Sequence, residues 1–416
     1  MRAFLAVIVV AACKPAAAPR FTLRIAVSGP LAPMGPDAEL RSWTVVAQEY
    51  VFEPLVNIGL DGEILPALAA KAEIAGTNGL RVWLRGGAQF SDGSPVTFAD
   101  VADSVAASKL RATNEGQSIL VTSSEPGVPI ELLLSRTFIF RRAGNRVSGT
   151  GEFAVAEEDA THLLVNRLQS EPGFIDRVRV DSYPTPQEAF ARTLKGDADF
   201  LVEVEPRWVE FFEGVPRLRI LRAPGTRANM VAFNPARLSR SERLALAGAL
   251  AADDIRRLAF GDDCVPPGRR PGIEPLPAGR ALEVLALPFF DRFAFVVRRA
   301  LTERGGAVRV VEAPDFIATV RSGGFDLATF RFLVWPAAFV WRTGAESNLL
   351  GYSNPAVDAA IDARNWTGAQ RALEEDPPGA VVCTPPSVLV LDARIKVPPF
   401  SPGGFMRSLP RWEVLQ

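Results

Sequence analysis

The segment from Tyr50 to Val105 reads YVFEPLVNIGLDGEILPALAAKAEIAGTNGLRVWLRGGAQFSDGSPVTFADVADSV. Within it, Leu80 to Arg85 alternates apolar and charged side chains, which predicts a half-buried strand. Asp92-Gly93 is a tight-turn dipeptide, because glycine adopts positive φ at little steric cost. Thr97, with Asp100 three residues later, is typical of a capping box that opens a helix. The local order is therefore strand, turn and helix.

The same segment is similar to a known protein family. The sequence contains the segments EPLV, DGEILPALA and LRVWLRGGAQFSDGSPVTFADV. In this order they resemble the signature of the family 5 extracellular solute-binding proteins. The run from Phe90 to Val101 is the most specific part. These proteins are the oligopeptide-, dipeptide- and nickel-binding receptors of bacterial ABC importers. The resemblance implies an α/β fold, the two-lobed clamshell of type II periplasmic-binding proteins.

Looser matches to the family follow in the same order along the chain. The chain is short for the family, and the missing length is expected between Val105 and Gly149, where members carry an extra subdomain, and again after Ile361. We therefore expect a shortened lobe one. The matching segments are FTLRIAV (21–27), GTGEF (149–153), FARTLKGDADF (190–200), VAFN (231–234), a helix within 244–260, GGFDLATF (323–330) and YSNPAVDAAI (352–361).

The chain between residues 282 and 330 alternates strand and helix patterns. Asp315 stands at the start of the second helix, and Gly323-Gly324 ends it. Strands that alternate with helices at this spacing predict a parallel sheet with right-handed crossovers. The expected elements are strands at 282–287, 308–311 and 325–330 and helices at 292–304 and from 315 onward.

The resemblance implies four regions of the chain. Residues 1–12 are expected to be a signal peptide, and residues 13–20 a lipidated cysteine with its tether. Lobe one is expected at 21–232 plus 385–416, and lobe two at 233–384. The chain would then cross between the lobes near Asn234 and Pro385.

The first twenty residues carry their own signal. Arg2 precedes the short apolar run AFLAVIVV, which falls short of the roughly 20 residues that span a bilayer and fits a secretory signal. Small residues then lead to Cys13, which resembles a lipobox, so Cys13 is expected to be lipidated. The alternative is a buried strand that ends in a free thiol. We accordingly predict a periplasmic lipoprotein held at the membrane.

The composition of the chain argues against several classes of function. The 416 residues carry a net charge of −1, which gives no reason to expect nucleic acid as a partner. The only histidine, His162, and two spare cysteines cannot build a usual zinc site, and no HExxH, GxSxG or P-loop motif occurs. We therefore expect no metal, no cofactor and no enzyme. Cys264 and Cys383 are either a disulfide or two buried thiols.

The resemblance also directs attention to residues for ligand binding. Peptide-binding members carry an acidic residue in the loop that here reads RFLVWPAAFVWRTGAESN, but this sequence has no Asp or Glu between Asp326 and Glu346. Aromatic walls with a few polar groups suit a ligand cleft. The candidate ligand-binding residues are Ser28, Phe233, Asn234, Arg331, Phe332, Trp335 and Trp341. Alternatively, Trp335 and Trp341 pack lobe two, and Phe233 and Asn234 pack the hinge.

Three functions compete on this sequence. The first is a monomeric, lipid-anchored receptor that delivers a peptide-like or apolar solute to the permease of an ABC importer. The second is a protein of the same fold that acts as a sensor partner or periplasmic chaperone. The third is an exported hydrolase, although the sequence contains no motif that indicates one. Linear peptides with a free amino end are expected to bind weakly, because a buried ammonium without a carboxylate is costly.

Overall fold

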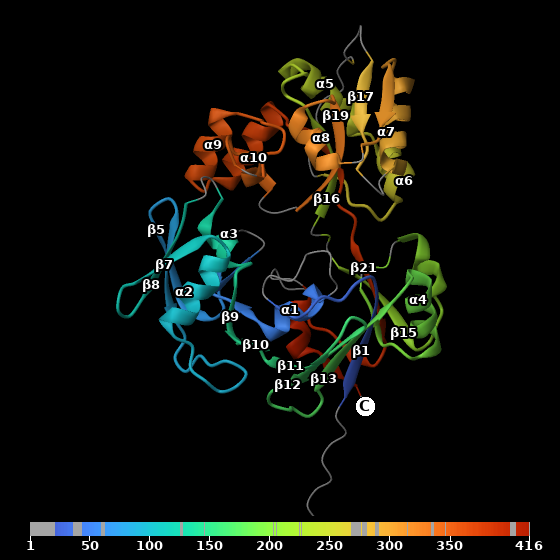
Figure 1. The fold of residues 1–416 in the computed structure, drawn as a ribbon. Coiled ribbons are helices and arrows are strands. Elements are labelled where there is room, and N and C mark those ends of the chain that lie inside the picture. The colour runs from blue at the N-terminus through green and yellow to red at the C-terminus, as the bar shows by residue number, and fades with distance from the viewer. Residues whose placement is uncertain are drawn as a thin grey trace, which may run out of the picture.

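The chain folds into three bodies, two lobes and a small subdomain (Figure 1). The computed structural model describes residues 21–415 except 36–43, 60–62, 125–127, 145, 203, 205, 224, 226, 268–275, 277–280, 288–290, 314, 334–336, 346 and 400–404. The predicted signal peptide, Cys13 and the tether lie outside the described residues. The two-lobed α/β arrangement expected from the sequence is confirmed, with lobe two above lobe one and the small subdomain in Figure 1.

Lobe one is built on a seven-stranded mixed sheet. In spatial order its strands are β11 (Phe153–Glu158), β12 (His162–Arg167), β13 (Arg177–Tyr183), β1 (Thr22–Ser28), β14 (Phe200–Leu201), β21 (Ser387–Asp392) and β15 (Leu218–Ala223). Strand β1 runs parallel to both of its neighbours. Leu23, Ile25 and Val27 enter the larger core, whereas Ala26 enters the core on the other face. Both faces of the sheet are therefore buried, which accounts for the apolar character of β1.

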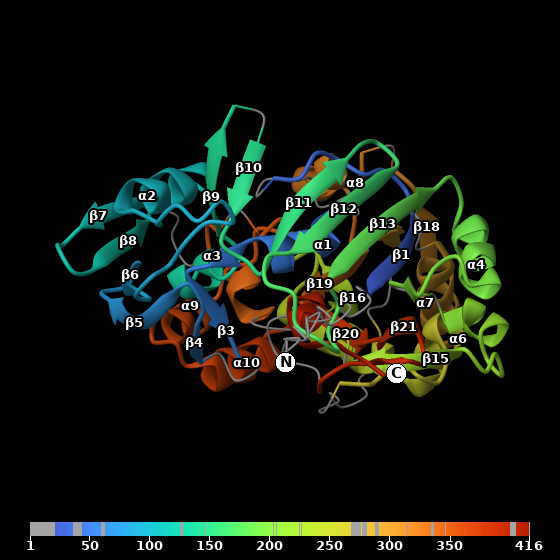
Figure 2. The same cartoon turned by 90° about the horizontal axis from the view of Figure 1, so that it is seen from below.

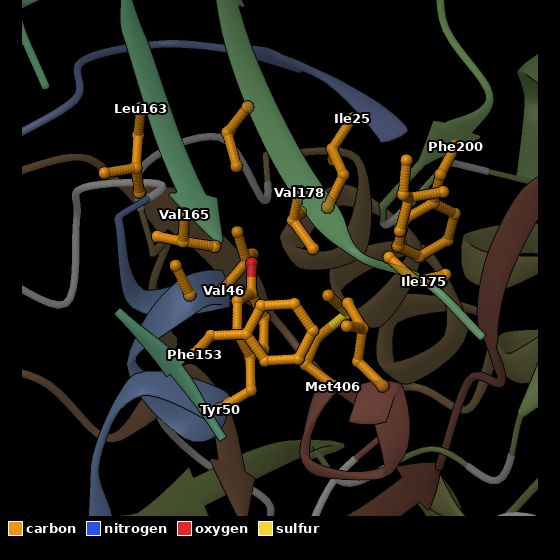
Figure 3. Packing of buried hydrophobic residues seen from close by; sticks show 14 of the residues in the cluster. Ile25, Val46, Tyr50, Phe153, Leu163, Val165, Ile175, Val178, Phe200 and Met406 are labelled. Atoms are coloured by element: carbon orange, nitrogen blue, oxygen red, sulfur yellow. The ribbon is translucent and has the colours of Figure 1, made fainter. Parts of the chain in front are cut away.

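Helices cover the two faces of this sheet. Helix α1 (Val45–Val51) and the 3-10 turn η3 (Met406–Arg411) cover the face that carries Ile25, and α4 (Pro186–Lys195) and η1 (Pro206–Phe211) cover the opposite face. Figure 3 shows Tyr50 and Met406 packed with Phe153 under the strands. The C-terminal segment thus completes a core that the N-terminal strand begins, and β22 (Ile395–Lys396) pairs there with β23 (Glu413–Val414).

The small subdomain has a core of its own. Its sheet contains β5 (Ala69–Ala75), β6 (Gly79–Leu84), β8 (Ile119–Ser123) and β7 (Leu110–Asn114), and α2 (Phe98–Ala107) and α3 (Ile130–Leu134) pack on it. Figure 2 shows it beside lobe one, on the side away from α4. Five elements thus lie between Val105 and Gly149, where we expected missing length. The elements that connect it to lobe one are β2 (Glu53–Pro54), β3 (Val56–Ile58), β4 (Ile64–Pro66), β9 (Phe138–Ala143) and β10 (Arg146–Gly149).

Lobe two is built on a five-stranded sheet. Its spatial order is β18 (Val308–Val311), β17 (Leu282–Leu285), β19 (Leu327–Leu333), β16 (Arg227–Phe233) and β20 (Gly379–Cys383). Helices α5 (Arg240–Leu250), α6 (Asp253–Phe260) and α7 (Asp291–Glu303) cover one face. The other face carries α8 (Phe316–Ser322), η2 (Ala337–Trp341), α9 (Pro355–Asp362) and α10 (Trp366–Glu375).

The predicted alternation of strands and helices in lobe two is confirmed. Strand β17 pairs in parallel with both β18 and β19. The side chain of Asp315 caps α8, and that of Asn354 caps α9, which begins with Pro355. The expected helix within 244–260 differs, because α5 ends at Leu250 and α6 starts at Asp253. Asp253 and Asp254 stand in the first turn of α6, where negative charge favours a helix N-terminus.

The chain crosses between the lobes earlier than the sequence suggested. Strand β15 ends at Ala223 in the lobe one sheet, and β16 already pairs with β19 and β20 of lobe two from Arg227 onward. The first crossing therefore lies between these strands, and the predicted boundary at Phe233 is corrected. The second crossing joins β20 to β21, at the predicted position near Pro385.

The signature run from Phe90 to Val101 has a structural role in the small subdomain. Arg141 of β9 donates to both carboxylate oxygens of Asp100, at 2.8 and 2.7 Å, and to the Ser94 hydroxyl at 2.6 Å. Its guanidinium also lies 4.4 Å from the centre of the Phe90 ring. The run that carries the resemblance is thus held to the neighbouring strand by one arginine, and the expected capping box of Thr97 and Asp100 is confirmed.

The GTGEF turn is also structural. A Cβ on Gly149 would come within 2.0 Å of the Val51 carbonyl oxygen, and one on Gly151 within 2.3 Å of the Tyr50 carbonyl oxygen. Only glycine allows this close approach to the end of α1. Because Ser91 N–H donates to the Gly149 carbonyl at 2.9 Å, the turn also joins the signature run to lobe one.

Candidate functional site

In both large sheets, the parallel strands end on the side where the chain crosses between the lobes. In lobe one, Ala223 of β15 lies opposite Ser387 at the start of β21, which marks the crossing end of the sheet. Strand β14 is antiparallel to β21 and parallel to β1, so β1 ends toward the crossing at Ser28. Strand β13 ends there too, with Tyr183 in register with Ser28.

Lobe two shows the same arrangement. Arg227, at the start of β16, pairs with Leu333 at the end of β19, so β19 and its parallel neighbours β17 and β18 end toward the crossing. Carboxyl ends of parallel strands are the usual location of ligand sites in α/β proteins, and clefts between domains are a second one. Both rules indicate the space between the lobes as the candidate site.

The two crossings touch each other. A Cβ on Gly225 in the first crossing would come within 2.0 Å of the Pro385 carbonyl oxygen in the second. Thr384 and Val265 exchange backbone hydrogen bonds of 3.0 and 2.8 Å. Cys383, at the end of β20, is disulfide-bonded to Cys264, with 5.6 Å between the Cα atoms. The disulfide and these backbone hydrogen bonds therefore hold the start of the second crossing against lobe two.

Three of the predicted residues lie at this end of the sheets. Ser28 is half-buried at the end of β1. Arg331 is exposed in β19, opposite Asn229 of β16, whose buried amide oxygen has no hydrogen-bond partner among the described residues. Phe332, the next residue, stacks on Phe330 with 5.2 Å between ring centres. The structure thus brings Arg331 and Phe332 to the crossing end of the lobe two sheet.

Phe233 and Asn234 lie elsewhere. Strand β16 rises about 3.3 Å per residue, so Phe233 is about 20 Å from Arg227 and the crossing. Phe233 is fully buried in the lobe two core. The Asn234 amide donates to the carbonyls of Gly323 and Phe325, at 3.0 and 2.8 Å. Their expected place at the crossing is therefore corrected, because the chain enters lobe two at the opposite end of this strand.

Trp341 is a core residue of lobe two. Its ring is 5% exposed and lies 5.4 Å from the Phe332 ring and 6.1 Å from the Tyr352 ring, measured between centres. This position matches the alternative that the tryptophan packs lobe two. Trp335 lies outside the described residues.

Helix α3 of the small subdomain contacts lobe two. We call this contact the seam, and its apolar part consists of Val128, Leu132, Phe332, Phe339 and Val340. Beside them, Arg364 of lobe two donates to the carboxylate of Glu131 in α3, at 3.0 and 3.3 Å. Glu131 was missed by the sequence reasoning, although an acidic residue within the apolar run VPIELLL was a signal of a buried ion pair.

A pocket of about 260 Å³ lies beside the seam. Both of its arginines already have carboxylate partners, since Arg342 donates to Asp362 at 2.9 Å and Arg364 to Glu131. The charges of both arginines in this pocket are therefore already compensated. It is lined by Thr77, Asn78, Val128, Pro129, Arg342, Ile361, Asp362 and Arg364.

Arg136 and Arg227, which belong to different bodies, interact electrostatically. Arg136 lies two residues after the end of α3, and Arg227 is the first residue of β16. Desolvation lowers the pKa of Arg136, and the positive charge of Arg227 lowers this pKa further. Sequence reasoning missed both residues, since each is an ordinary exposed arginine in its local context.

In the described part of the chain, no group of three or more His, Cys, Asp or Glu side chains is placed to hold a metal ion. His162, the lone histidine, lies in β12 with its Nδ1 2.7 Å from Asp159. Among the described residues no helix has the length and apolar character that a membrane span requires.

No protein-family model matches the sequence, and no curated protein is significantly similar to it. Solved structures do match. The substrate-binding protein CtaP of Listeria monocytogenes is similar over 95% of this chain and 100% of its own, with a TM-score of 0.78 and 17% identity. The chain has the fold of ABC-transporter substrate-binding proteins.

Two further structures show the same fold. An ABC-transporter substrate-binding protein from Sinorhizobium meliloti matches over 95% of this chain and 100% of its own, with a TM-score of 0.75 and 18% identity. DppA from Helicobacter pylori, solved with the peptide STSA, matches over 96% and 99%, with a TM-score of 0.72 and 15% identity. The substrate-binding-protein fold therefore includes both lobes and the small subdomain of this chain.

Proposed function

We propose that this protein is the solute-binding receptor of an ABC importer. It captures a small ligand between its lobes and presents the closed, loaded form to the permease in the membrane. The protein acts as a monomer in the periplasm, held to the membrane by a lipid on Cys13. It performs no chemistry on the ligand.

One observation carries this proposal. The carboxyl ends of the parallel strands in both sheets, at Ser28 and Tyr183 in lobe one and at Leu333 in lobe two, face each other across two touching crossings. Such an arrangement allows two rigid bodies to close on a ligand with small changes at a few hinge residues. The fold shared with substrate-binding proteins over most of the chain supports the same function.

The ligand class follows from the charges near the cleft. No Asp or Glu stands between Asp326 and Glu346, the loop that follows β19. A peptide with a free amino end would therefore bury its ammonium without a carboxylate partner there, which is costly. Arg331 at the end of β19 favours a ligand that is neutral or negative at this point. We propose a capped, cyclic or otherwise peptide-like or apolar solute.

The test is native mass spectrometry of the protein purified without denaturation, followed by small-angle scattering before and after removal of the bound molecule. The proposal expects a retained small molecule and a smaller radius of gyration with it. A panel of unmodified linear tripeptides should bind weakly. Protein that retains no small molecule and does not change shape with any tested extract would contradict the receptor function.

Tryptophan variants locate the ligand. Trp335→Ala should weaken binding of the retained molecule by about 1–3 kcal/mol if the ring forms a desolvated wall of the site. Trp208→Ala is the matched control, because Trp208 stacks on Phe211 within lobe one, with 5.6 Å between ring centres. Equal affinity in both variants would move the site toward the loops near Ser28.

A further inference from the structure

Helix α3 divides its side chains between two bodies. Ile130 and Leu134 belong to the core of the small subdomain, whereas Leu132 belongs to the apolar part of the seam and is 6% exposed. Glu131, the residue before Leu132, is also buried and binds Arg364 of lobe two. The small subdomain therefore presents one apolar and one acidic side chain whose partners lie in lobe two.

The turn η2 of lobe two divides its side chains in the same way. Ala338 and Trp341 belong to the core of lobe two, whereas Phe339 and Val340 belong to the seam. Phe339 and Val340 are each 8% exposed. Exposure of large apolar side chains to water is unfavourable. Separation of the two bodies at the seam would therefore remove the partners of Leu132, Phe339 and Val340 together.

The seam closes a ring of three bodies. The two crossings join the lobes, and the small subdomain is joined to lobe one by the chain on both sides of it and by the close approach of Gly149 to Val51. Among the described residues, neither strand pairing nor a backbone hydrogen bond joins the small subdomain to lobe two. Figure 1 shows α3 and α9 on one side of the molecule and the crossing between β16 and β21 on the other.

The seam is also a contact of limited extent. The pocket beside it is lined by Asn78 of the small subdomain and Asp362 of lobe two, so the two surfaces are apart there. Contacts between domains of one chain allow relative motion unless they are large and hydrophobic. If the small subdomain stays with lobe one, any rotation that opens the lobes must pull α3 away from η2 and from Arg364.

We propose that the seam is a latch, a contact that forms when the lobes close and that favours the closed form without touching the ligand. This inference rests on the proposed receptor function and names a control on the same site. The free energy of the seam adds to that of the bound ligand, because both favour the closed form. Ligand affinity then depends on side chains that lie outside the space between the lobes.

The experiment measures small-angle scattering of the full protein after retained molecules have been removed. Leu132→Asp and Glu131→Arg should each increase the radius of gyration, because each removes one part of the latch. Leu194→Asp is the matched control, since Leu194 is 39% exposed on α4, on the side of lobe one away from the small subdomain, and it should keep the wild-type radius. Far-ultraviolet circular dichroism checks that all variants are folded.

A charge swap separates opening from misfolding. Arg364→Glu alone should increase the radius, whereas Arg364→Glu combined with Glu131→Arg should restore the smaller wild-type radius, because the pair is reversed and not removed. The second readout is the affinity for the molecule retained by the wild type. Leu132→Asp should weaken this affinity by at least about fivefold, the range of a coupling between distinct sites, and Leu194→Asp should leave it unchanged.

Each outcome has a defined meaning. Equal radii in wild type, Leu132→Asp and Glu131→Arg overturn the latch. Lower unfolding midpoints in these variants, with unchanged radius and affinity, would show that the seam is a permanent joint, and this result also overturns the latch. If a molecule is retained equally by all variants of equal radius, the receptor function stands and the latch falls. If nothing is retained but the seam variants open, the latch stands and the receptor function falls.

Discussion

Arg364 of lobe two binds Glu131 of the small subdomain through two hydrogen bonds of 3.0 and 3.3 Å, across 233 residues of sequence. The Glu131 side chain is 5% exposed and that of Arg364 is 23% exposed. Arg364 has a φ of 52°, which is uncommon for a residue other than glycine. Apolar contacts in the seam are not directional, whereas the hydrogen bonds of this ion pair are. The ion pair therefore fixes the orientation of α3 against lobe two.

Glu131→Gln should loosen the seam. The change leaves the Arg364 guanidinium partly buried without a counter-charge, and we expect a loss of about 1–3 kcal/mol in the free energy of unfolding. Urea unfolding measures the loss. Glu303→Gln is the control, because Glu303 pairs with Arg299 on the exposed face of α7 at 2.7 Å, and it should stay within about 0.5 kcal/mol of wild type. Equal losses in both variants would show that the seam pair is no stronger than a surface pair.

Gly225→Ala should push the two crossings apart. The added Cβ would meet the Pro385 carbonyl oxygen at 2.0 Å, and backbone must move to make room. We expect a loss of about 1–3 kcal/mol in stability and a changed radius of gyration. Gly86→Ala, in an exposed turn with open space around it, is the control and should leave both unchanged. A variant that keeps the wild-type scattering profile would mean that the crossings tolerate separation without changing the lobe arrangement.

Asp100→Asn should lower stability in a pH-dependent way. Burial opposes ionisation of Asp100, but the Arg141 guanidinium and Thr97 outweigh burial and hold its pKa at about 2, below its ordinary value. The stabilisation is therefore present above about pH 4 and lost as the pH falls through about 2. At pH 7 we expect the free energy of unfolding of the wild type to exceed that of the variant by about 2 kcal/mol.

The matched control for this measurement is Asp103→Asn, on the exposed side of the same helix. Unfolding midpoints between pH 7 and pH 2 decide the prediction. The Asp100→Asn curve should approach wild type toward pH 2, while the Asp103→Asn curve follows wild type throughout. A difference that is constant with pH would assign the Asp100 effect to packing and not to ionisation.

Reduction of the disulfide between Cys264 and Cys383 should destabilise lobe two. The bridge closes a long stretch of chain, with a sequence separation of 119 between the cysteines, and loss of such a bridge costs about 2–5 kcal/mol. Thermal unfolding with and without reductant measures the effect. Thiol labelling of denatured, unreduced protein is the second measurement, and labelling of both cysteines would contradict the bridge.

Cys13→Ser should separate the protein from the membrane. If Cys13 carries the lipid, the variant accumulates as a soluble exported form or as an uncleaved precursor, because the modified residue is also the cleavage site. Fractionation and intact mass of the expressed protein show which form is present. A variant that stays in the membrane fraction with the expected mass of the wild type would rule out lipidation at this residue.

Local chemistry made the elements of lobe two predictable. Alternating strands and helices between β17 and β19, and the caps at Asp315 and Asn354, depend on residues a few positions apart. The first crossing was not predictable in this way. Strands β15 and β16 are both short apolar strands separated by three residues, and nothing local tells which sheet each one joins.

The candidate site depends on contacts that sequence cannot show. Asp100 was expected to cap a helix, but its binding to Arg141 spans 41 residues. Glu131 and Arg364 belong to different bodies and meet only after these bodies pack. Trp341 was expected near the ligand because an aromatic residue in a loop suits both a binding wall and a core. Only burial distinguishes the two roles, and this ring is buried.

Both crossings leave their sheets at one edge. Strands β21 and β15 are the last two strands of the lobe one sheet, and β16 and β20 are the last two of the lobe two sheet. The two lobes are thus joined along a single edge, which can act as a hinge axis. Rotation about this edge moves β11 and β18, at the opposite edges of the two sheets, the furthest. Arg227, the first residue of β16, lies beside this edge and moves least. A ligand between the lobes would therefore lose its contacts at the outer edge first and those beside β15 and β16 last.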